Sequence, residues 1–240
     1  MLQALKRIVR RHVPVLLRER ISLWRQRGPL ALGRGSHVHW SVQILGRRHV
    51  RIGENSGVSE RCWLNVNHPL PGGFAITIGD HTFIGRDNFM SSGRSIRIGH
   101  YCLTTLGCKF ICSTHIADTP NSPIIATGTT AADEIRVGDN CFFGVNAMVL
   151  GNVDIGHGCV IGAGAVLTAD VPPFSLVIGN PARVIKHYSF RRGAWIAVDA
   201  LQPGDMDDNP DALTYLARLR STHPQVDMPW VALGADLGSL

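Results

Sequence analysis

The sequence contains no apolar run that approaches 18 residues, which excludes a membrane-spanning helix of ordinary length. The first apolar stretch, Val13 to Leu17, includes Pro14 and is followed at once by Arg18, so it does not resemble the core of a signal peptide. No two cysteines have the CxxC spacing of metal or redox motifs, and unpaired thiols suit a reducing compartment. We therefore expect a cytoplasmic protein that holds no metal.

Acidic residues are scarce at the N-terminus. Residues 1–27 hold eight Lys or Arg and one acid, Glu19, whereas the rest of the chain holds 16 basic and 17 acidic residues. The basic character therefore belongs to this segment and not to the body of the protein, which argues against a nucleic-acid-binding protein. Apolar residues at helical spacing predict that residues 1–50 contain a basic amphipathic helical arm and a lead-in. Such an arm either contacts an anionic membrane surface through residues 1–27 or packs on the body with its charges in water.

A six-residue period runs from Ile52 to Leu167. A large apolar residue opens each unit, Gly often follows it, and the fifth position is small; five of the six cysteines occupy that fifth position. The apolar positions are Ile52, Val58 and Leu64; Ile78, Ile84 and Met90; Ile98 and Phe110; and then Val137, Phe143, Val149, Ile155, Ile161 and Leu167. This period fits neither an amphipathic helix nor an ordinary strand, and it is typical of a parallel β-helix in which three hexapeptides form one coil.

The period is interrupted twice. The first interruption is the segment Asn67 to Gly73, and the second is residues 114–134, which show no periodicity. A loop of this length within a wound solenoid is often functional, so we expect residues 114–134 to protrude and to carry function.

The pattern predicts a β-helix domain over 51–187 and an extension over 188–240 with one helix. We expect Asn209 to cap that helix and Pro210 to be its first residue. His81, His100 and His157 fall on turns of the repeat, where we expect them to be solvated.

The repeats, the segment Ser113-Thr114-His115 and the closing stretch from Asp170-Val171-Pro172-Pro173 to Gly179-Asn180-Pro181-Ala182-Arg183-Val184-Ile185-Lys186 resemble the hexapeptide-repeat acyltransferases. The branch that they resemble contains the galactoside, maltose and polysaccharide O-acetyltransferases. The resemblance covers about residues 50–187. It implies left-handed β-helices assembled as a homotrimer, with acetyl-CoA bound between subunits.

The resemblance also implies that His115 is the catalytic residue. Transfer of an acetyl group from a thioester to a sugar hydroxyl needs a base that removes the hydroxyl proton, and imidazole can accept a proton near neutral pH and return it to the thiolate. The competing interpretation is an ordinary surface histidine, but His115 lies where the period stops and the long loop begins.

By position in the resembling motifs, Ala163 and Thr168 would contact the pantetheine arm of acetyl-CoA, and Gly144 would bring backbone amides near the thioester carbonyl. Arg183 and Lys186 match the basic residues near the phosphates of the cofactor.

The acceptor side departs from the family. The galactoside and maltose enzymes place an Asn and an Asp ahead of the catalytic His, whereas this chain has Asn88 and, at the Asn position, Ser92, with no evident Asp. Asp118 either orients the imidazole, contacts the acceptor or is simply solvated. We therefore expect a carbohydrate acceptor that is neither a simple galactoside nor maltose.

The sequence thus favours an acetyl-CoA-dependent O-acetyltransferase in surface polysaccharide or glycolipid biosynthesis. Three alternatives stay open: an N-acetyltransferase of an amino sugar or antibiotic, a metalloenzyme of the carbonic anhydrase type, which would need three His ligands, and a non-catalytic structural β-helix.

Overall fold

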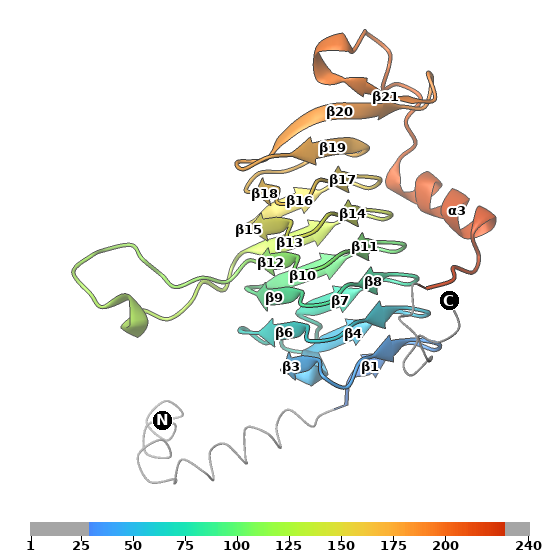
Figure 1. Cartoon of the computed structure of the whole chain (residues 1–240). Helices are drawn as coiled ribbons and strands as arrows, with labels where there is room; N and C mark the ends of the chain where they lie inside the picture. The colour runs from blue at the N-terminus through green and yellow to red at the C-terminus, as the bar shows by residue number, and fades with distance from the viewer. Residues whose placement is uncertain (1–28, 229–240) are drawn as a thin grey trace, which may run out of the picture.

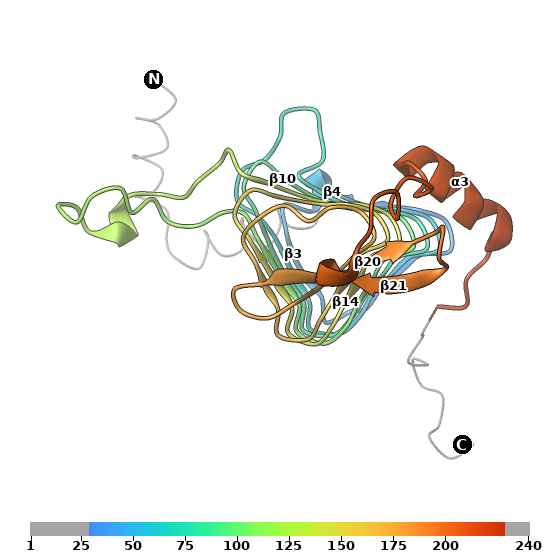
Figure 2. The same cartoon turned by 90° about the horizontal axis from the view of Figure 1, so that it is seen from above.

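The computed structural model describes residues 29–228, which form three sheets around a triangular prism (Figures 1 and 2). Sheet A contains β1 (Ala31–Leu32), β4 (Val50–Ile52), β7 (Ile76–Ile78), β10 (Ser95–Ile98), β13 (Glu134–Val137) and β16 (Val153–Ile155). Sheet B contains β2 (His37–Val38), β5 (Gly57–Val58), β8 (Phe83–Ile84), β11 (Leu103–Thr104), β14 (Phe142–Phe143), β17 (Val160–Ile161), β19 (Ser175–Ile178), β20 (Arg183–Ser189) and β21 (Ala194–Ala197). Sheet C contains β3 (Gln43–Leu45), β6 (Trp63–Val66), β9 (Phe89–Ser92), β12 (Lys109–Ile111), β15 (Met148–Leu150) and β18 (Val166–Leu167).

Successive strands pass from sheet A to B to C, and each pairs in parallel with the equivalent strand of the next coil. Seen from the C-terminal end, the chain turns clockwise while it rises toward the viewer, which is a left-handed winding (Figure 2). The predicted left-handed parallel β-helix is confirmed. We call the three corners the A–B, B–C and C–A edges, after the sheets that they join.

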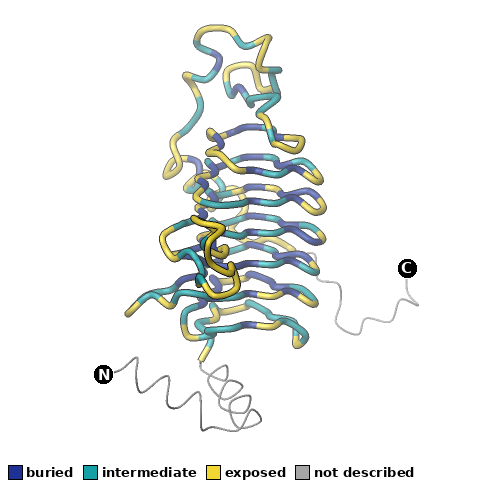
Figure 3. Tube along the Cα trace, turned by 90° about the vertical axis from the view of Figure 1, so that its left-hand side faces the viewer, coloured by how far each residue is buried: buried dark blue, intermediate teal, exposed yellow. Residues whose placement is uncertain are grey.

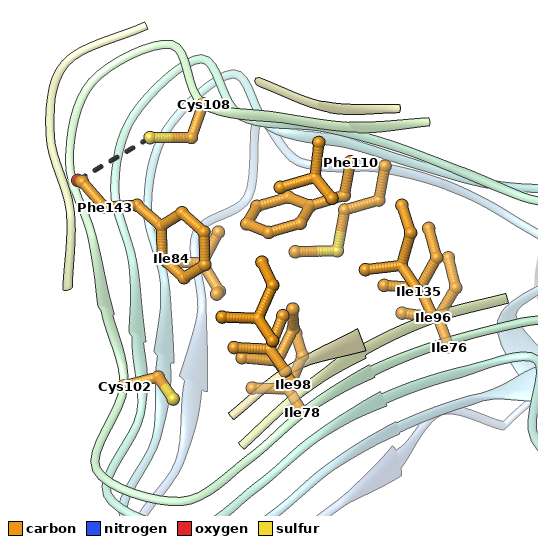
Figure 4. Close-up of a cluster of buried hydrophobic side chains, with 14 of the residues drawn as sticks. Ile76, Ile78, Ile84, Ile96, Ile98, Cys102, Cys108, Phe110, Ile135 and Phe143 are labelled. Carbon is orange, nitrogen blue, oxygen red and sulfur yellow. Dashed lines mark hydrogen bonds between the residues drawn. The ribbon is translucent and has the colours of Figure 1, made fainter. Parts of the chain in front are cut away.

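The core of the prism is built from the apolar positions of the six-residue period. Equivalent side chains of successive coils stack on one another, as Ile78 and Ile98 do, and Phe110 meets Phe143 edge-to-face with ring centroids 5.1 Å apart (Figure 4). Between Ile98 and Phe110 the period lacks an apolar residue, because buried Thr104 fills that inward position. Its hydroxyl accepts a hydrogen bond from Gly85 N at 3.0 Å.

The small fifth positions do more than fill the corners. Along the A–B edge, each hydroxyl or thiol donates to a backbone carbonyl of the next coil: Ser56 to Gly79 at 2.8 Å, Thr82 to Gly99 at 2.8 Å, Cys102 to Gly138 at 3.2 Å, and Cys141 to Gly156 at 3.2 Å. All six cysteines are buried and free, and five of them occupy these small fifth positions. We call this column of side chains the corner ladder.

The β-helix begins at Ala31 and not at residue 51, where the predicted domain begins. Leu32, Val38 and Ile44 already follow the six-residue period, and they align with Ile52, Val58 and Leu64 of the next coil. The 3₁₀ helix η1 (Arg47–His49) shifts the frame between these coils and thereby hides the first coil from a periodicity search.

The C-terminal extension continues sheet B and then covers a corner of the prism. Strands β20 and β21 pair antiparallel, η3 (Val198–Ala200) follows, and helix α3 (Ala212–Thr222) lies beside the A–B edge (Figures 1 and 2). The predicted helix exists, but its cap is Asp211, whose carboxylate accepts from Thr214 N at 2.9 Å. Asn209 instead bonds the backbone of Tyr188 and Phe190, so its prediction as the cap was wrong.

Of the three turn histidines, His157 is buried beneath the extension. Its ring packs edge-to-face on Phe174 at 4.7 Å and lies 3.1 Å from the Pro210 carbonyl, so the expectation that it is solvated was wrong. His81 stacks on Tyr101 and His100 pairs with Asp80 at 3.1 Å. The predicted arm of residues 1–27 lies outside the described residues. None of the helices in the described part is long and apolar enough to cross a membrane.

Candidate active site

The longest excursion from the prism leaves the C–A edge between β12 and β13. This segment matches the loop predicted over 114–134 and contains η2 (Ile124–Ala126) (Figures 1 and 2). From here on we call it the arm; it is distinct from the N-terminal segment of residues 1–27. Its residues are mainly exposed, in contrast with the striped burial of the coils (Figure 3).

Two segments of the arm pair at its root. Thr130 N donates to Thr114 O at 2.8 Å, Ile116 N donates to Gly128 O at 3.2 Å, and His115 therefore lies opposite Thr129 in an antiparallel bridge. His115 is exposed, and within residues 29–228 its imidazole makes no hydrogen bond. Because no neighbouring group in this part of the chain binds it, the His115 imidazole can accept a proton from a substrate.

The short loop Asn67 to Gly73 leaves the same edge and reaches the root of the arm. His68 Nε2 lies 3.0 Å from Thr129 Oγ1, so a second histidine bonds the residue that lies opposite the predicted catalytic one. The sequence analysis missed His68 because the loop has no period that would fix its place in space. The interruption of the period after Leu64 was the only available signal.

A cysteine and a serine also lie at the arm root, but neither is built as a nucleophile. Cys112 is buried, and burial raises the pKa of its thiol to about 11. Ser113 is buried as well, and its hydroxyl donates to Thr130 O at 3.0 Å. Because the thiolate is the nucleophilic form of cysteine, Cys112 stays inert near neutral pH.

The residues predicted to contact the acyl donor fall into two places. Ala163 follows β17 at the B–C edge and stacks above Gly144, so closely that a Cβ on Gly144 would lie 2.5 Å from Ala163 N. Arg183 pairs with Ile178 near the same edge and is exposed, while Lys186 lies further along β20. Thr168 is exposed but follows β18 at the C–A edge.

Gly144 does not supply a free amide. It is buried, and its N–H donates to Ile161 O at 2.8 Å as part of the bonding between coils. If Gly144 brings a backbone amide near the thioester carbonyl, that amide is therefore one of a neighbouring residue. Ala163 is exposed, and its N–H makes no backbone hydrogen bond in the described part of the chain, so Ala163 is the available donor at this edge.

Two of the three residues predicted to contact the acceptor lie inside the prism. Asn88 is 1 % exposed, and its amide donates to Gly85 O at 3.1 Å and to Thr105 O at 2.7 Å, so it holds the B–C corner together. Ser92 is fully buried on β9. Both predictions are corrected, because residue type alone does not distinguish an inward position from a surface one. Asp118 is exposed on the arm and forms no hydrogen bond with His115.

His115 and the pair Gly144 and Ala163 therefore lie at opposite edges of sheet C, the first after β12 and the others at the start of β15 and β18. A single chain does not bring the histidine and Ala163 together. Within residues 29–228, no three His, Cys, Asp or Glu side chains are grouped closely enough to hold a metal ion.

The amino-acid sequence was compared with family models and with curated proteins. The family model for the hexapeptide repeat of succinyl-transferase matches residues 134–169. A probable acetyltransferase of Mycobacterium tuberculosis is 29 % identical over 171 residues, which are 71 % of this chain and 53 % of that protein. Over its repeats the chain is similar to the hexapeptide-repeat acyltransferases.

A second relative is similar over a shorter stretch of the chain. A Staphylococcus aureus protein named as an acetyltransferase is 34 % identical over 114 residues, which are 48 % of this chain and 56 % of that protein. The chain thus spans about half the length of the curated relatives that it matches. The Bacillus cereus N-acyltransferase AntD, solved with dTDP and 3-hydroxybutyryl-CoA, has the same fold: the TM-score is 0.57 at 17 % identity, over 71 % of this chain and 87 % of AntD.

Proposed function

We propose that this hexapeptide-repeat acyltransferase is an O-acetyltransferase that moves an acetyl group from acetyl-CoA to a sugar hydroxyl. The observation that carries the proposal is His115, which is exposed at the ordered root of the arm and bonded to no other described residue. In this mechanism the imidazole takes the hydroxyl proton while the acceptor oxygen attacks the thioester carbonyl. The C–S bond then breaks, and the imidazolium returns the proton to the leaving thiolate.

The donor site of the proposal is the B–C edge. The N–H of Ala163 supports the charge that develops on the thioester oxygen, and Arg183 and Lys186 attract the phosphates of acetyl-CoA. AntD, which shares the fold, was solved with 3-hydroxybutyryl-CoA, and this supports acyl-CoA as the donor here. Thr168 lies at the C–A edge, as His115 does, so it would contact this donor from a neighbouring subunit.

The proposed assembly is a homotrimer in which His115 of one subunit faces the B–C edge of the next. The separation of the two groups across sheet C supports this arrangement, since neither edge is complete alone. The arm also ends in two exposed isoleucines, Ile124 at 51 % and Ile125 at 89 % exposure. Large apolar side chains at the tip of a protruding segment suit burial against a second copy of the chain.

Thiol release from acetyl-CoA tests the activity, with a panel of hydroxyl-only sugars, amino sugars and lipid-linked glycan precursors as acceptors. We expect release that depends on a hydroxyl acceptor and falls about 10²- to 10⁴-fold in His115→Ala, with the Kd for acetyl-CoA little changed. His223→Ala is the matched control, because within residues 29–228 that exposed side chain hydrogen-bonds only the neighbouring Thr222.

Near-normal turnover in His115→Ala would remove this histidine from the mechanism. Release with amines alone would assign the protein to N-acetylation, and surface polysaccharide or glycolipid biosynthesis would then lose its support. Failure to bind CoA would favour a structural β-helix.

A further inference from the structure

The bridge at the arm root fixes which side chains face His115. The hydrogen bonds run between the neighbours of the bridged pair, from Thr130 to Thr114 and from Ile116 to Gly128, and not between His115 and Thr129 themselves. The pair is therefore of the non-hydrogen-bonded type, in which the Cα atoms are about 4.5 Å apart and the side chains lie closest. The hydroxyl of Thr129 consequently lies on the same face as the His115 imidazole.

That hydroxyl also binds the second histidine. His68 Nε2 is 3.0 Å from Thr129 Oγ1. A threonine hydroxyl has one donor and two acceptor positions, so the bond to His68 leaves capacity on the His115 side. Thr129 thus bonds the imidazole of His68 and lies opposite His115, two histidines that are 47 positions apart in the sequence.

His68 is itself held in place by the short loop. Asn67 Nδ2 donates to Ser91 Oγ on β9 at 2.9 Å, and Asn65 Nδ2 donates to Asn67 Oδ1 at 2.6 Å. At the other end of the loop, His49 Nδ1 lies 3.2 Å from the Gly73 carbonyl. The loop is therefore bonded to two coils, and His68 reaches the arm from a fixed support.

We propose that His68 is a positioning residue for His115 and acts through the hydroxyl of Thr129. The proposal rests on the proposed function, because it assigns His115 as the base. An arm joined to the prism only at its root would let the imidazole move relative to the prism. The bond between His68 and Thr129 joins the arm to the next loop along the C–A edge and fixes the face on which His115 lies. Small displacements of a catalytic group cost up to about 10²-fold in rate.

Four variants test the proposal: His68→Ala, Thr129→Val, their combination and Thr129→Ser. We expect His68→Ala and Thr129→Val each to lower kcat about tenfold, with the KM for acetyl-CoA unchanged, because the geometry of the base and not the donor site is altered. The double variant should be no slower than either single variant, since one shared interaction is lost. Thr129→Ser keeps the hydroxyl and should retain wild-type kcat.

Thr127→Val is the matched control, because within the described part of the chain the Thr127 hydroxyl bonds only to the arm itself, at Ile124 O at 2.7 Å. Normal kcat in His68→Ala, or independent losses that multiply in the double variant, would overturn the positioning role. A fall in kcat for the control as large as that for Thr129→Val would do so as well.

Hydrogen exchange at Ile116 and Thr130 separates this proposal from the proposed function. Exchange should quicken equally in His68→Ala, Thr129→Val and the double variant. If exchange quickens equally in the three variants but the wild type shows no acyl transfer, the proposed function alone is refuted. If the wild type transfers acyl groups but exchange does not quicken equally in the variants, only the role of His68 is refuted.

Discussion

Replacement of Thr82 by valine isolates the contribution of the corner ladder. Thr82 is fully buried, its hydroxyl donates to Gly99 O at 2.8 Å, and the same oxygen accepts from Cys102 N at 3.1 Å. Valine has nearly the same shape, so the change creates no cavity. It leaves one carbonyl and one N–H of the next coil buried without these partners.

The magnitude follows from these two groups. Each buried polar group left unsatisfied costs about 1–3 kcal/mol, which gives about 2–6 kcal/mol for the pair. The extra buried methyl group offsets about 1 kcal/mol of this. The free energy of unfolding should therefore fall by about 1–5 kcal/mol in Thr82→Val. Thr82→Ser keeps both hydrogen bonds, loses one methyl group and should cost about 1 kcal/mol.

Equilibrium urea unfolding, followed by far-ultraviolet circular dichroism, measures both variants. The protein concentration must be the same throughout, because assembly stabilises the folded chain by mass action, and equal m-values show that the unfolding transition is comparable. Our reasoning would be refuted by a valine variant no less stable than the serine variant. In that case the ladder would act only through the size of its side chains.

Two further predictions concern the surface. The Ser59 hydroxyl, together with the Arg86 ion pair at 2.9 Å, lowers the pKa of Glu60 from 4.5 to about 2, so its stabilising effect is present above about pH 4.5 and is lost as the pH falls toward 2. Between about pH 4.5 and 2, the free energy of unfolding of Glu60→Gln should therefore fall by up to about 1 kcal/mol less than that of the wild type, as measured by urea unfolding at several pH values. An equal fall in both proteins would contradict this cause. Ile125→Ser should raise the concentration at which the proposed trimer dissociates, as measured by sedimentation or light scattering. The free energy of unfolding of the single chain should change by less than about 0.5 kcal/mol. A wild-type protein that is monomeric would refute the proposed assembly.

The six-residue period predicted the prism because its inward positions obey a strict geometric rule. An apolar residue such as Ile84 or Phe143 recurs wherever the chain crosses a face, and a small one wherever it turns. The rule fails where residues are inserted: η1 moved the frame and hid the coil that begins at Ala31. The hydrogen bonds of the corner ladder were also hidden, because cysteine and serine were interpreted by size alone.

The candidate site was less predictable than the fold. His115 was found because it lies where the period stops, and the structure places it at the root of the arm. Asn88 and Ser92 were misplaced because both side chains are buried, at positions that only the three-dimensional winding defines. His68 was missed because its role depends on a contact between two loops, and the sequence holds no measure of that distance.

The antiparallel hairpin of β20 and β21 has a consequence for how far the stack can extend. The last coil of a parallel β-helix would offer an open edge onto which another coil could be added, and such open edges are a usual route to fibre formation. On sheet B the chain reverses after β19, so that the uppermost strands no longer present a parallel template. On sheet A, Val171 bridges to Ile155, and the next two residues are Pro172 and Pro173, which have no N–H to offer. On these two sheets the prism therefore carries its own terminator at the C-terminal end.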